Sequence, residues 1–320
     1  MGVYHLAGLG KNPGAVIVPL TYIFFKKKRE LIDKDEKAKE FFSYSGEKDN
    51  QEKNKGIPEG LIVFSSKEVI DEGERDQVVD QLCRLSISDR DDAADIIKKY
   101  LKKLIENLKL RSCVYSEFGV RYFYLIRVDI NNYDDCYKKI YLTMKQLKDK
   151  EVHVNLIGGT NQINLALMMA SAMTAIPSKL YYVFENKVSY LHPSKVTSFN
   201  AKISAPPENW FEIPLVFVSL SELIGKFKEI GLVEGCCNVS QIKNILNELG
   251  LGNQFIAKLR TGWLKFENEE KVTAGESLKK IISIQSELDE LEKLLLSDSN
   301  WKMFEQEGWL KKIIDDGKEV

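Results

Sequence analysis

Two glycine-rich turns carry the residues of this chain that could bind a phosphate. One of them, Gly158-Gly159-Thr160-Asn161, follows the apolar stretch Val152–Ile157 and precedes a stretch rich in Ala, Leu and Met. This pattern predicts a buried strand, a tight turn and a helix. Such a turn directs backbone N–H groups and the positive helix end at whatever lies above the strand, and glycine allows close approach. An ordinary strand-to-helix connection would have the same local sequence.

The other turn, Gly8-Leu-Gly-Lys-Asn-Pro-Gly14, follows a predicted strand that begins at Val3. Asn12 is a suitable N-cap for the helix expected next, and Pro13 suits its first position. Lys11 would lie in the loop close to this helix end. The turn lacks the Gly-Lys-Ser/Thr of a Walker A loop and the third glycine of the dinucleotide-binding fingerprint.

Alternating strands and helices are expected to position both turns. This order predicts an α/β fold with a Rossmann-like parallel sheet and right-handed crossovers. The charge-dense stretch 26–56 is read as a helix end and a surface loop, and residues 201–212 as a linker. Strands are expected at 3–8, 61–64, 122–130, 152–157 and 179–184, with an edge hairpin at 187–191. Helices are expected at 15–28, 132–148 and 161–173, and residues 68–110 should be mostly helical with a turn around 86–92.

A second domain is expected over residues 206–320. Its pattern is similar to a winged helix-turn-helix, with a two-stranded wing that turns at Asn268. A leucine-rich stripe on the long helix expected over 276–296 is interpreted as part of the core or as a dimer interface. Helices are expected at 219–231, 240–250, 253–260, 276–296 and 301–314, with the wing over 263–272.

Composition limits the function classes. The 320 residues suggest about two domains, and the net charge of −1 excludes a global basic field for nucleic acid. Residues 211–320 hold 14 Lys and Arg against 19 Asp and Glu, so DNA binding by the winged domain is possible but not favoured. Five cysteines without CxxC spacing indicate reduced thiols in a cytoplasmic protein. No apolar run approaches the ~20 residues of a membrane span, and no signal peptide is evident.

Residues 1–205 resemble a CARF domain, the Rossmann-like sensor of type III CRISPR systems. The resemblance rests on Gly8–Gly14 and on Asn155-Leu-Ile-Gly-Gly-Thr-Asn161, which is similar to the family's Asn-x-Thr-Gly-Gly-Thr-Lys. A polar-capped helix from Asp134 also fits, whereas Asn161 replaces a frequent lysine. The resemblance implies a homodimer that binds one cyclic oligoadenylate ring, such as cyclic tetra-adenylate, across its two-fold axis.

Both turns should meet at the switch point of the sheet, where open α/β folds bind ligands. The resemblance implies metal-independent ring cleavage, in which a ribose 2′-hydroxyl attacks the neighbouring phosphorus. No cofactor or metal is expected. The candidate catalytic residues are Lys11, Thr160 and Asn161, and the candidate ligand-binding residues are Gly8, Gly10, Asn12, Gly158, Gly159 and Asn164.

Other effector chemistry finds little support. The three histidines are His5, His153 and His192, so the second domain lacks the Arg-His site of a HEPN ribonuclease. Residues 211–288 contain no aspartate to complete a nuclease around Glu269-Glu-Lys271. Three alternatives stay open: a sensor that does not hydrolyse its ligand, a ligand-controlled transcription regulator, and a nucleotide-binding protein outside CRISPR defence.

Overall fold

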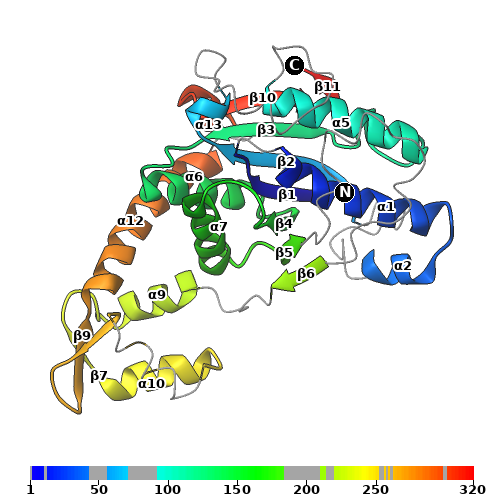
Figure 1. The fold of residues 1–320 in the computed structure, drawn as a ribbon. Helices are drawn as coiled ribbons and strands as arrows, with labels where there is room; N and C mark the ends of the chain where they lie inside the picture. Colours follow the sequence, from blue (N-terminus) through cyan, green and yellow to red (C-terminus); the bar gives the residue numbers. More distant parts are fainter. Residues whose placement is uncertain are drawn as a thin grey trace. The chain divides into compact units, whose positions relative to one another are not determined.

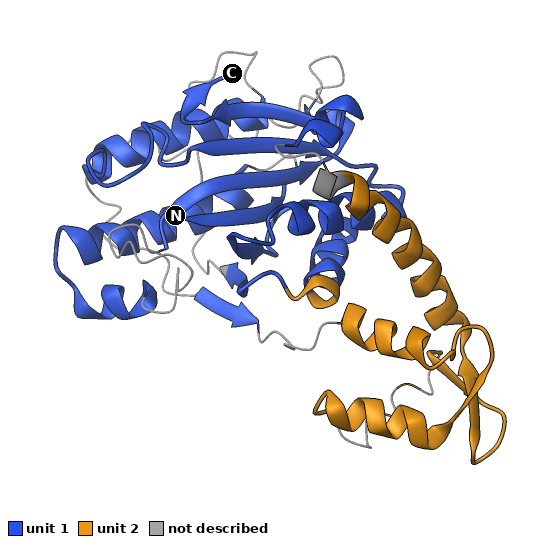
Figure 2. Cartoon of the chain, turned by 180° about the vertical axis from the view of Figure 1, so that it is seen from behind, with its two compact units in different colours: residues 1–171, 176–215, 300–320 blue, residues 172–175, 216–299 orange. Residues whose placement is uncertain are grey.

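The computed structural model divides the chain into two compact units (Figure 2). Unit 1 comprises residues 1–171, 176–215 and 300–320, and unit 2 comprises 172–175 and 216–299. The residues that the structure describes are 2–10, 13–42, 56–70, 92–183, 210–213, 220–251, 256, 259, 262–297 and 301–320. Within them, no helix is long and apolar enough to cross a lipid bilayer.

Unit 1 is built on a sheet whose described strands lie in the order β11-β10-β3-β2-β1-β4-β5-β6 (Figure 1). The five inner strands are parallel and the outer ones are antiparallel to their neighbours. This arrangement confirms the predicted α/β fold with a Rossmann-like parallel sheet. The strands are β1 (Val3–Gly8), β2 (Pro58–Ser65), β3 (Tyr122–Arg127), β4 (Glu151–Asn155), β5 (Lys179–Val183), β6 (Trp210–Ile213), β10 (Leu310–Asp315) and β11 (Lys318–Glu319).

Helices cover both faces of this sheet, so β1 and β2 are buried along their whole length. One face packs on α1 and α5 in a single core that includes Ala7, Val63 and Leu125. The crossovers β3-α6-β4 and β4-α7-β5 run the opposite way across the sheet, so right-handed connections place α6 and α7 on the other face. The helices of unit 1 are α1 (Gly14–Leu31), α2 (Glu36–Phe42), α3 (Lys67–Ile70), α5 (Ala93–Leu108), α6 (Tyr133–Gln146), α7 (Asn161–Thr174) and α13 (Lys302–Gln306).

The end of the chain corrects the helix predicted over 301–314. Helix α13 ends at Gln306, and β10 and β11 follow, with β10 antiparallel to β3. Ile314 is completely buried in the core of unit 1. A short apolar run cannot be assigned to a helix or a strand from its period alone, and here the open edge of β3 decides the outcome. Residues 300–320 therefore lie in unit 1, whereas the sequence-based boundary placed them in a domain over 206–320.

The linker predicted over 201–212 also ends in a strand. Its last residues belong to β6, which pairs with β5. Trp210 stacks on Tyr181 and on Tyr22, with ring centroids 4.3 Å and 5.1 Å apart. Residues 201–209 and the predicted hairpin at 187–191 lie outside the described residues.

Unit 2 contains a two-stranded hairpin, called the wing below, where the sequence predicted the wing. Strands β8 and β9 pair antiparallel around a turn where Asn268 Oδ1 accepts hydrogen bonds from the N–H groups of Glu270 and Lys271, at 2.9 and 2.8 Å. Leu278 and Leu288 of the long helix are buried, so part of the leucine-rich stripe belongs to a core. Most of the helix predicted over 253–260 lies outside the described residues. The elements are α9 (Leu220–Glu229), β7 (Cys236–Asn238), α10 (Val239–Glu248), β8 (Leu264–Phe266), β9 (Lys271–Ala274) and α12 (Glu276–Ser297).

Candidate functional site

The two glycine turns leave the sheet from adjacent parallel strands. β1 lies beside β4, with Leu6 opposite Val154 and Ala7 opposite Asn155. The chain continues from β1 to β2 in one direction across the sheet and from β4 to β5 in the other. This reversal is a topological switch point, the place where open α/β sheets bind ligands.

At the switch point the backbones of the two turns touch. A Cβ atom placed on Gly8 would lie 2.5 Å from the carbonyl oxygen of Gly158 and 2.8 Å from Cα of Gly159. A Cβ on Gly158 would in turn collide with the carbonyl oxygen of Gly8. Gly159 also has φ of +82°, a conformation that side chains disfavour. By contrast, a Cβ on Gly10 would meet no atom within 4 Å.

Buried side chains hold these turns from both neighbouring strands. Asn155, 2% exposed at the end of β4, donates from Nδ2 to the carbonyl oxygen of Ala15 at 3.0 Å. Its Oδ1 accepts from the N–H of Ile157 at 2.9 Å. On the other side, the hydroxyl of Ser65 at the end of β2 donates to the carbonyl oxygen of Leu9 at 2.7 Å. Asn155 is the first residue of the CARF-like motif, but neither Asn155 nor Ser65 was predicted as a site residue. Their signal was a polar residue at the very end of an apolar strand.

Each turn ends at a helix N-terminus. Thr160 caps α7, because its Oγ1 accepts from the N–H of Ile163 at 3.4 Å. Pro13 precedes α1 with helical backbone angles, φ of −65° and ψ of −16°, and its carbonyl oxygen accepts from the N–H groups of Val16 and Ile17. These angles agree with the first helical position predicted for Pro13. Asn12, the predicted N-cap, lies outside the described residues.

The predicted site residues separate into three groups. Gly8, Gly158, Gly159 and Thr160 lie together at the switch point, and Asn161 is the exposed first residue of α7. Asn164 lies one turn along α7 and is half-buried. Its Oδ1 has no hydrogen-bond partner within the described part of the chain. Gly10 follows in the open part of the first turn, and Lys11 and Asn12 lie outside the described residues.

The electrostatics of the two helix starts favour an anion. Neither α1 nor α7 has an acidic residue in its first turn, and α10 has none either, whereas α5, α6, α9 and α12 each have one or more. Acidic side chains at that position usually compensate the positive end of the helix dipole. The two helices at the switch point therefore keep this partial positive charge for a ligand.

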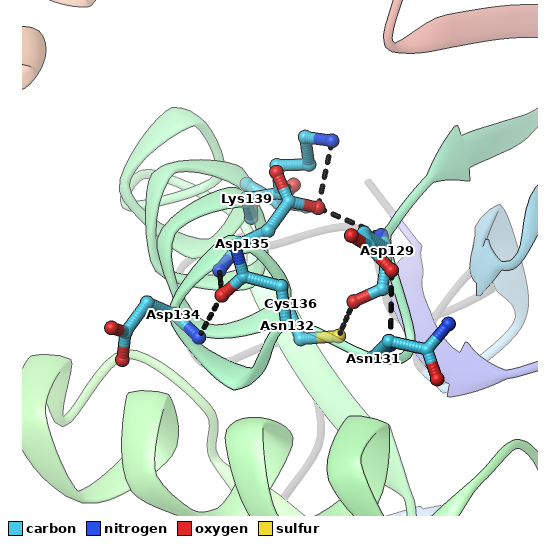
Figure 3. Close-up of polar contacts among 8 residues, drawn as sticks. Asp129, Asn131, Asn132, Asp134, Asp135, Cys136 and Lys139 are labelled. Carbon is cyan, nitrogen blue, oxygen red and sulfur yellow. Dashed lines mark hydrogen bonds and ion pairs between the residues drawn. The ribbon is translucent and has the colours of Figure 1, made fainter.

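A third loop, between β3 and α6, is closed by its own hydrogen bonds (Figure 3). Asn132, not Asp134, is the N-cap of α6: its Oδ1 accepts from the N–H groups of Asp134 and Asp135 at 3.1 and 3.3 Å. The thiol of Cys136 donates to the carbonyl oxygen of Asp129 at 3.3 Å. Burial, aided by Asp135, raises the pKa of this thiol to about 11, so it is not a thiolate nucleophile at neutral pH.

The two described histidines are core residues. His5 and His153 face each other across β1 and β4 with ring centroids 5.3 Å apart. His5 Nδ1 is hydrogen bonded to the Tyr181 hydroxyl at 2.9 Å, and His153 Nε2 to Glu151 Oε1 at 3.0 Å. Burial lowers the pKa of both imidazoles, and the second imidazole lowers that of His5 further. Both are therefore core histidines, and each has one ring nitrogen in a hydrogen bond.

Within the described residues, neither a cavity nor a cluster of metal-binding side chains indicates a second functional site. A cavity of about 920 Å³ in unit 2 is lined by β7, the wing and the start of α12, including Cys236, Lys265 and Lys279, and touches neither turn. Its lining mixes lysines with glutamates, which selects no class of ligand. Over the described residues, no three His, Cys, Asp or Glu side chains gather closely enough to hold a metal ion.

Comparison with known proteins places the chain in a family. No protein-family model matches it. A protein of Archaeoglobus fulgidus, described as uncharacterised, is 39% identical over 292 residues that cover 89% of this chain and 90% of the relative. The chain belongs to the family of this archaeal protein.

Among solved structures, the chain is similar to Enterococcus italicus Csm6 bound to cyclic hexa-2'-fluoro-hexa-dAMP, with 12% identity and a TM-score of 0.39. That match covers 96% of this chain and spans 58% of the Csm6 chain. At this level the likeness assigns neither fold nor ligand to the archaeal family, and the conclusions below rest on the switch-point geometry.

Proposed function

We propose that the chain is a CARF-type sensor that binds a cyclic oligoadenylate, most simply cyclic tetra-adenylate, at the two glycine turns. The observation that carries the proposal is the backbone contact of Gly8 with Gly158 and Gly159 at the switch point. It joins the two glycine turns into one surface, with two helix N-termini free of acidic residues beside it. An anionic, ribose-containing ring suits such a surface because backbone N–H groups bind phosphate and amide or hydroxyl groups bind sugar and base edges.

The same site supports slow cleavage of the ring. In that reaction a ribose 2′-oxygen forms a bond to the adjacent phosphorus and the bond from phosphorus to the 5′-oxygen breaks. The 2′-hydroxyl proton passes to water and the 5′-oxygen takes up a proton. The protein needs only to hold the three atoms in line and to stabilise the developing charge. Lys11 is the single cationic residue in either turn, and Thr160 and Asn161 supply polar groups.

A homodimer would present both turns twice to a two-fold symmetric ring. Helix α7, which carries the second turn, has two large apolar side chains on its outer side: Leu165 is 57% exposed and Met168 is 45% exposed. Exposed apolar side chains on one helix face are typical of a surface that is covered by a partner. Replacing Leu165 and Met168 by Asp should convert a dimer into a monomer in light-scattering chromatography, and an unchanged mass would exclude this face.

The cleavage proposal has a direct assay. Purified protein is incubated with cyclic tetra-adenylate in the presence of EDTA, and the products are separated by chromatography. We expect linear products that end in a 2′,3′-cyclic phosphate, at a rate lost in Lys11→Ala. Binding without any linear product over many hours would leave a sensor that does not hydrolyse its ligand.

The small sheet of unit 2 supports a second candidate, a ligand-controlled transcription regulator. The three-stranded β7-β9-β8 sheet and its turn at Asn268, where a wing was predicted, are the observations that favour it. Residues 216–299 hold 10 Lys and Arg against 13 Asp and Glu, and this net negative charge opposes it, because phosphate contacts supply much of DNA affinity. A gel shift with the DNA upstream of its own gene, with and without cyclic tetra-adenylate, separates the two candidates.

A further inference from the structure

Asn155 hydrogen bonds to the backbone beside both turns of the proposed site. It lies at the carboxyl end of β4, next to β1, and is 2% exposed. Its amide nitrogen donates to Ala15 at the start of α1, directly after the first turn, and its amide oxygen accepts from Ile157, directly before the second turn. We propose that Asn155 is a positioning residue that sets the geometry of the two turns for their ligand; this inference rests on the proposed function.

The chemistry of the position requires an amide. One group of the side chain has to donate to a carbonyl oxygen and the other has to accept from an N–H group. A carboxylate keeps the acceptor for Ile157 but directs a second oxygen at the carbonyl oxygen of Ala15, which is repulsive. Alanine leaves both backbone groups without their side-chain partner in a part-buried place. Aspartate therefore breaks the link to α1 alone, and alanine breaks both links.

The hydrogen bond from Asn155 to Ala15 lies beside the place where the two turns pack most tightly. The carbonyl oxygen of Gly158 lies so close to Gly8 that not even a methyl group fits between the turns. Ala15 follows the first turn directly, and its Cβ lies 3.1 Å from where a Cβ on Gly158 would stand. A shift of the α1 start relative to the second turn thus moves the two sets of phosphate-facing N–H groups relative to each other. Misplacement of such groups by about 1 Å is enough to lose much of the affinity or rate that depends on their positions.

A matched control separates positioning from general loss of stability. Thr143 is also fully buried and donates from its hydroxyl to a backbone oxygen, that of Lys139, at 2.7 Å. It lies within α6, and this hydrogen bond stays within that helix. Thr143→Ala thus removes a hydrogen bond from a buried side chain to the backbone at a place that the proposal leaves out.

The experiment compares wild type, Asn155→Asp, Asn155→Ala and Thr143→Ala by urea unfolding, by calorimetric titration with cyclic tetra-adenylate, and by hydrogen exchange of the free proteins. We expect affinity to fall tenfold or more in both Asn155 variants and less than threefold in Thr143→Ala at similar stability. In Asn155→Asp, exchange should rise at the first turn of α1 while the Ile157 amide stays protected, and in Asn155→Ala it should rise at both.

Each outcome has a distinct meaning. If wild type binds and the Asn155 variants bind as tightly as Thr143→Ala, the positioning role is wrong. If exchange in the Asn155 variants does not rise at the start of α1, it is wrong as well, whether or not a ligand binds. If wild type fails to bind cyclic tetra-adenylate, the proposed function is wrong, and the exchange pattern alone decides whether Asn155 links the turns.

Discussion

Among single residues, Gly8 and Gly10 can be compared directly, because they differ in the space around them. Both lie in the first turn, yet a Cβ on Gly8 would collide with the second turn and one on Gly10 would meet nothing. Gly8→Ala should therefore destabilise the protein by about 1–3 kcal/mol and weaken cyclic tetra-adenylate binding. Gly10→Ala should leave the free energy of unfolding nearly unchanged. Equal unfolding midpoints of the two variants in urea would contradict the contact between the turns.

The buried histidines predict a dependence of stability on pH. Burial lowers the pKa of His5 and His153 in the folded state, while in the unfolded chain both titrate near 6.5. Below that pH the unfolded state binds more protons, so the free energy of unfolding falls as the pH falls. Each unit of pKa difference corresponds to about 1.4 kcal/mol. Urea unfolding between pH 5 and 8 should show this slope, and His5→Gln should reduce it; a flat wild-type profile would show that the imidazoles take up protons in the folded state.

The residue types of the turns could be predicted from sequence, but the side chains that hold the turns in place could not. Glycine, threonine and asparagine after a β-branched strand indicate a strand, a turn and a capped helix by local rules alone. The roles of Asn155 and Ser65 depend on which strands are neighbours. That information lies in the sheet order and not in the spacing along the chain.

At the scale of elements, Thr160 combines a structural and a proposed functional role. Its Oγ1 caps α7, so Thr160→Ala should cost about 0.5–2 kcal/mol of stability. Thr160→Ser keeps the hydroxyl and should preserve both stability and cyclic tetra-adenylate binding. Thermal unfolding and calorimetric titration of the two variants test this. A serine variant as unstable as the alanine variant would show that the hydroxyl does not cap the helix.

The last strands test whether the chain end belongs to the sheet of unit 1. Ile314 on β10 is completely buried, whereas Val320 is 73% exposed. Ile314→Ala should lower the free energy of unfolding by about 2–5 kcal/mol, and Val320→Ala should hardly change it. Equal effects of the two substitutions on the urea midpoint would mean that Ile314 of β10 does not pack into the core of unit 1.

Elements with long, clear periodicity were the predictable ones. The parallel strands and the helices after the two turns follow from alternating patterns, and the wing follows from two short strands around Asn268. The strands β6 and β10 were missed because each pairs antiparallel with a neighbour distant in sequence, β5 and β3 respectively. Edge strands of this kind are defined by the partner that they complete, which a local pattern does not contain.

At the scale of the whole molecule, unit 2 interrupts unit 1. Residues 216–299 lie in the sequence between β6 and β10, which lie on opposite sides of the parallel core of one sheet. The chain therefore leaves unit 1 beyond β5 and returns beside β3. A sensor domain cut at residue 205 would lack β6, β10 and β11, so measurements on the proposed site belong on the full chain.

The two touching turns are proposed to bind a cyclic oligoadenylate. A calorimetric titration of the full chain with cyclic tetra-adenylate tests this binding, with linear tetra-adenylate as the control and a thermal unfolding scan of the same samples. We predict saturable binding of one ring per two chains, no comparable heat from the linear RNA, and an unfolding temperature that rises with ring concentration. No binding heat and no shift in unfolding temperature at millimolar ring would contradict the account.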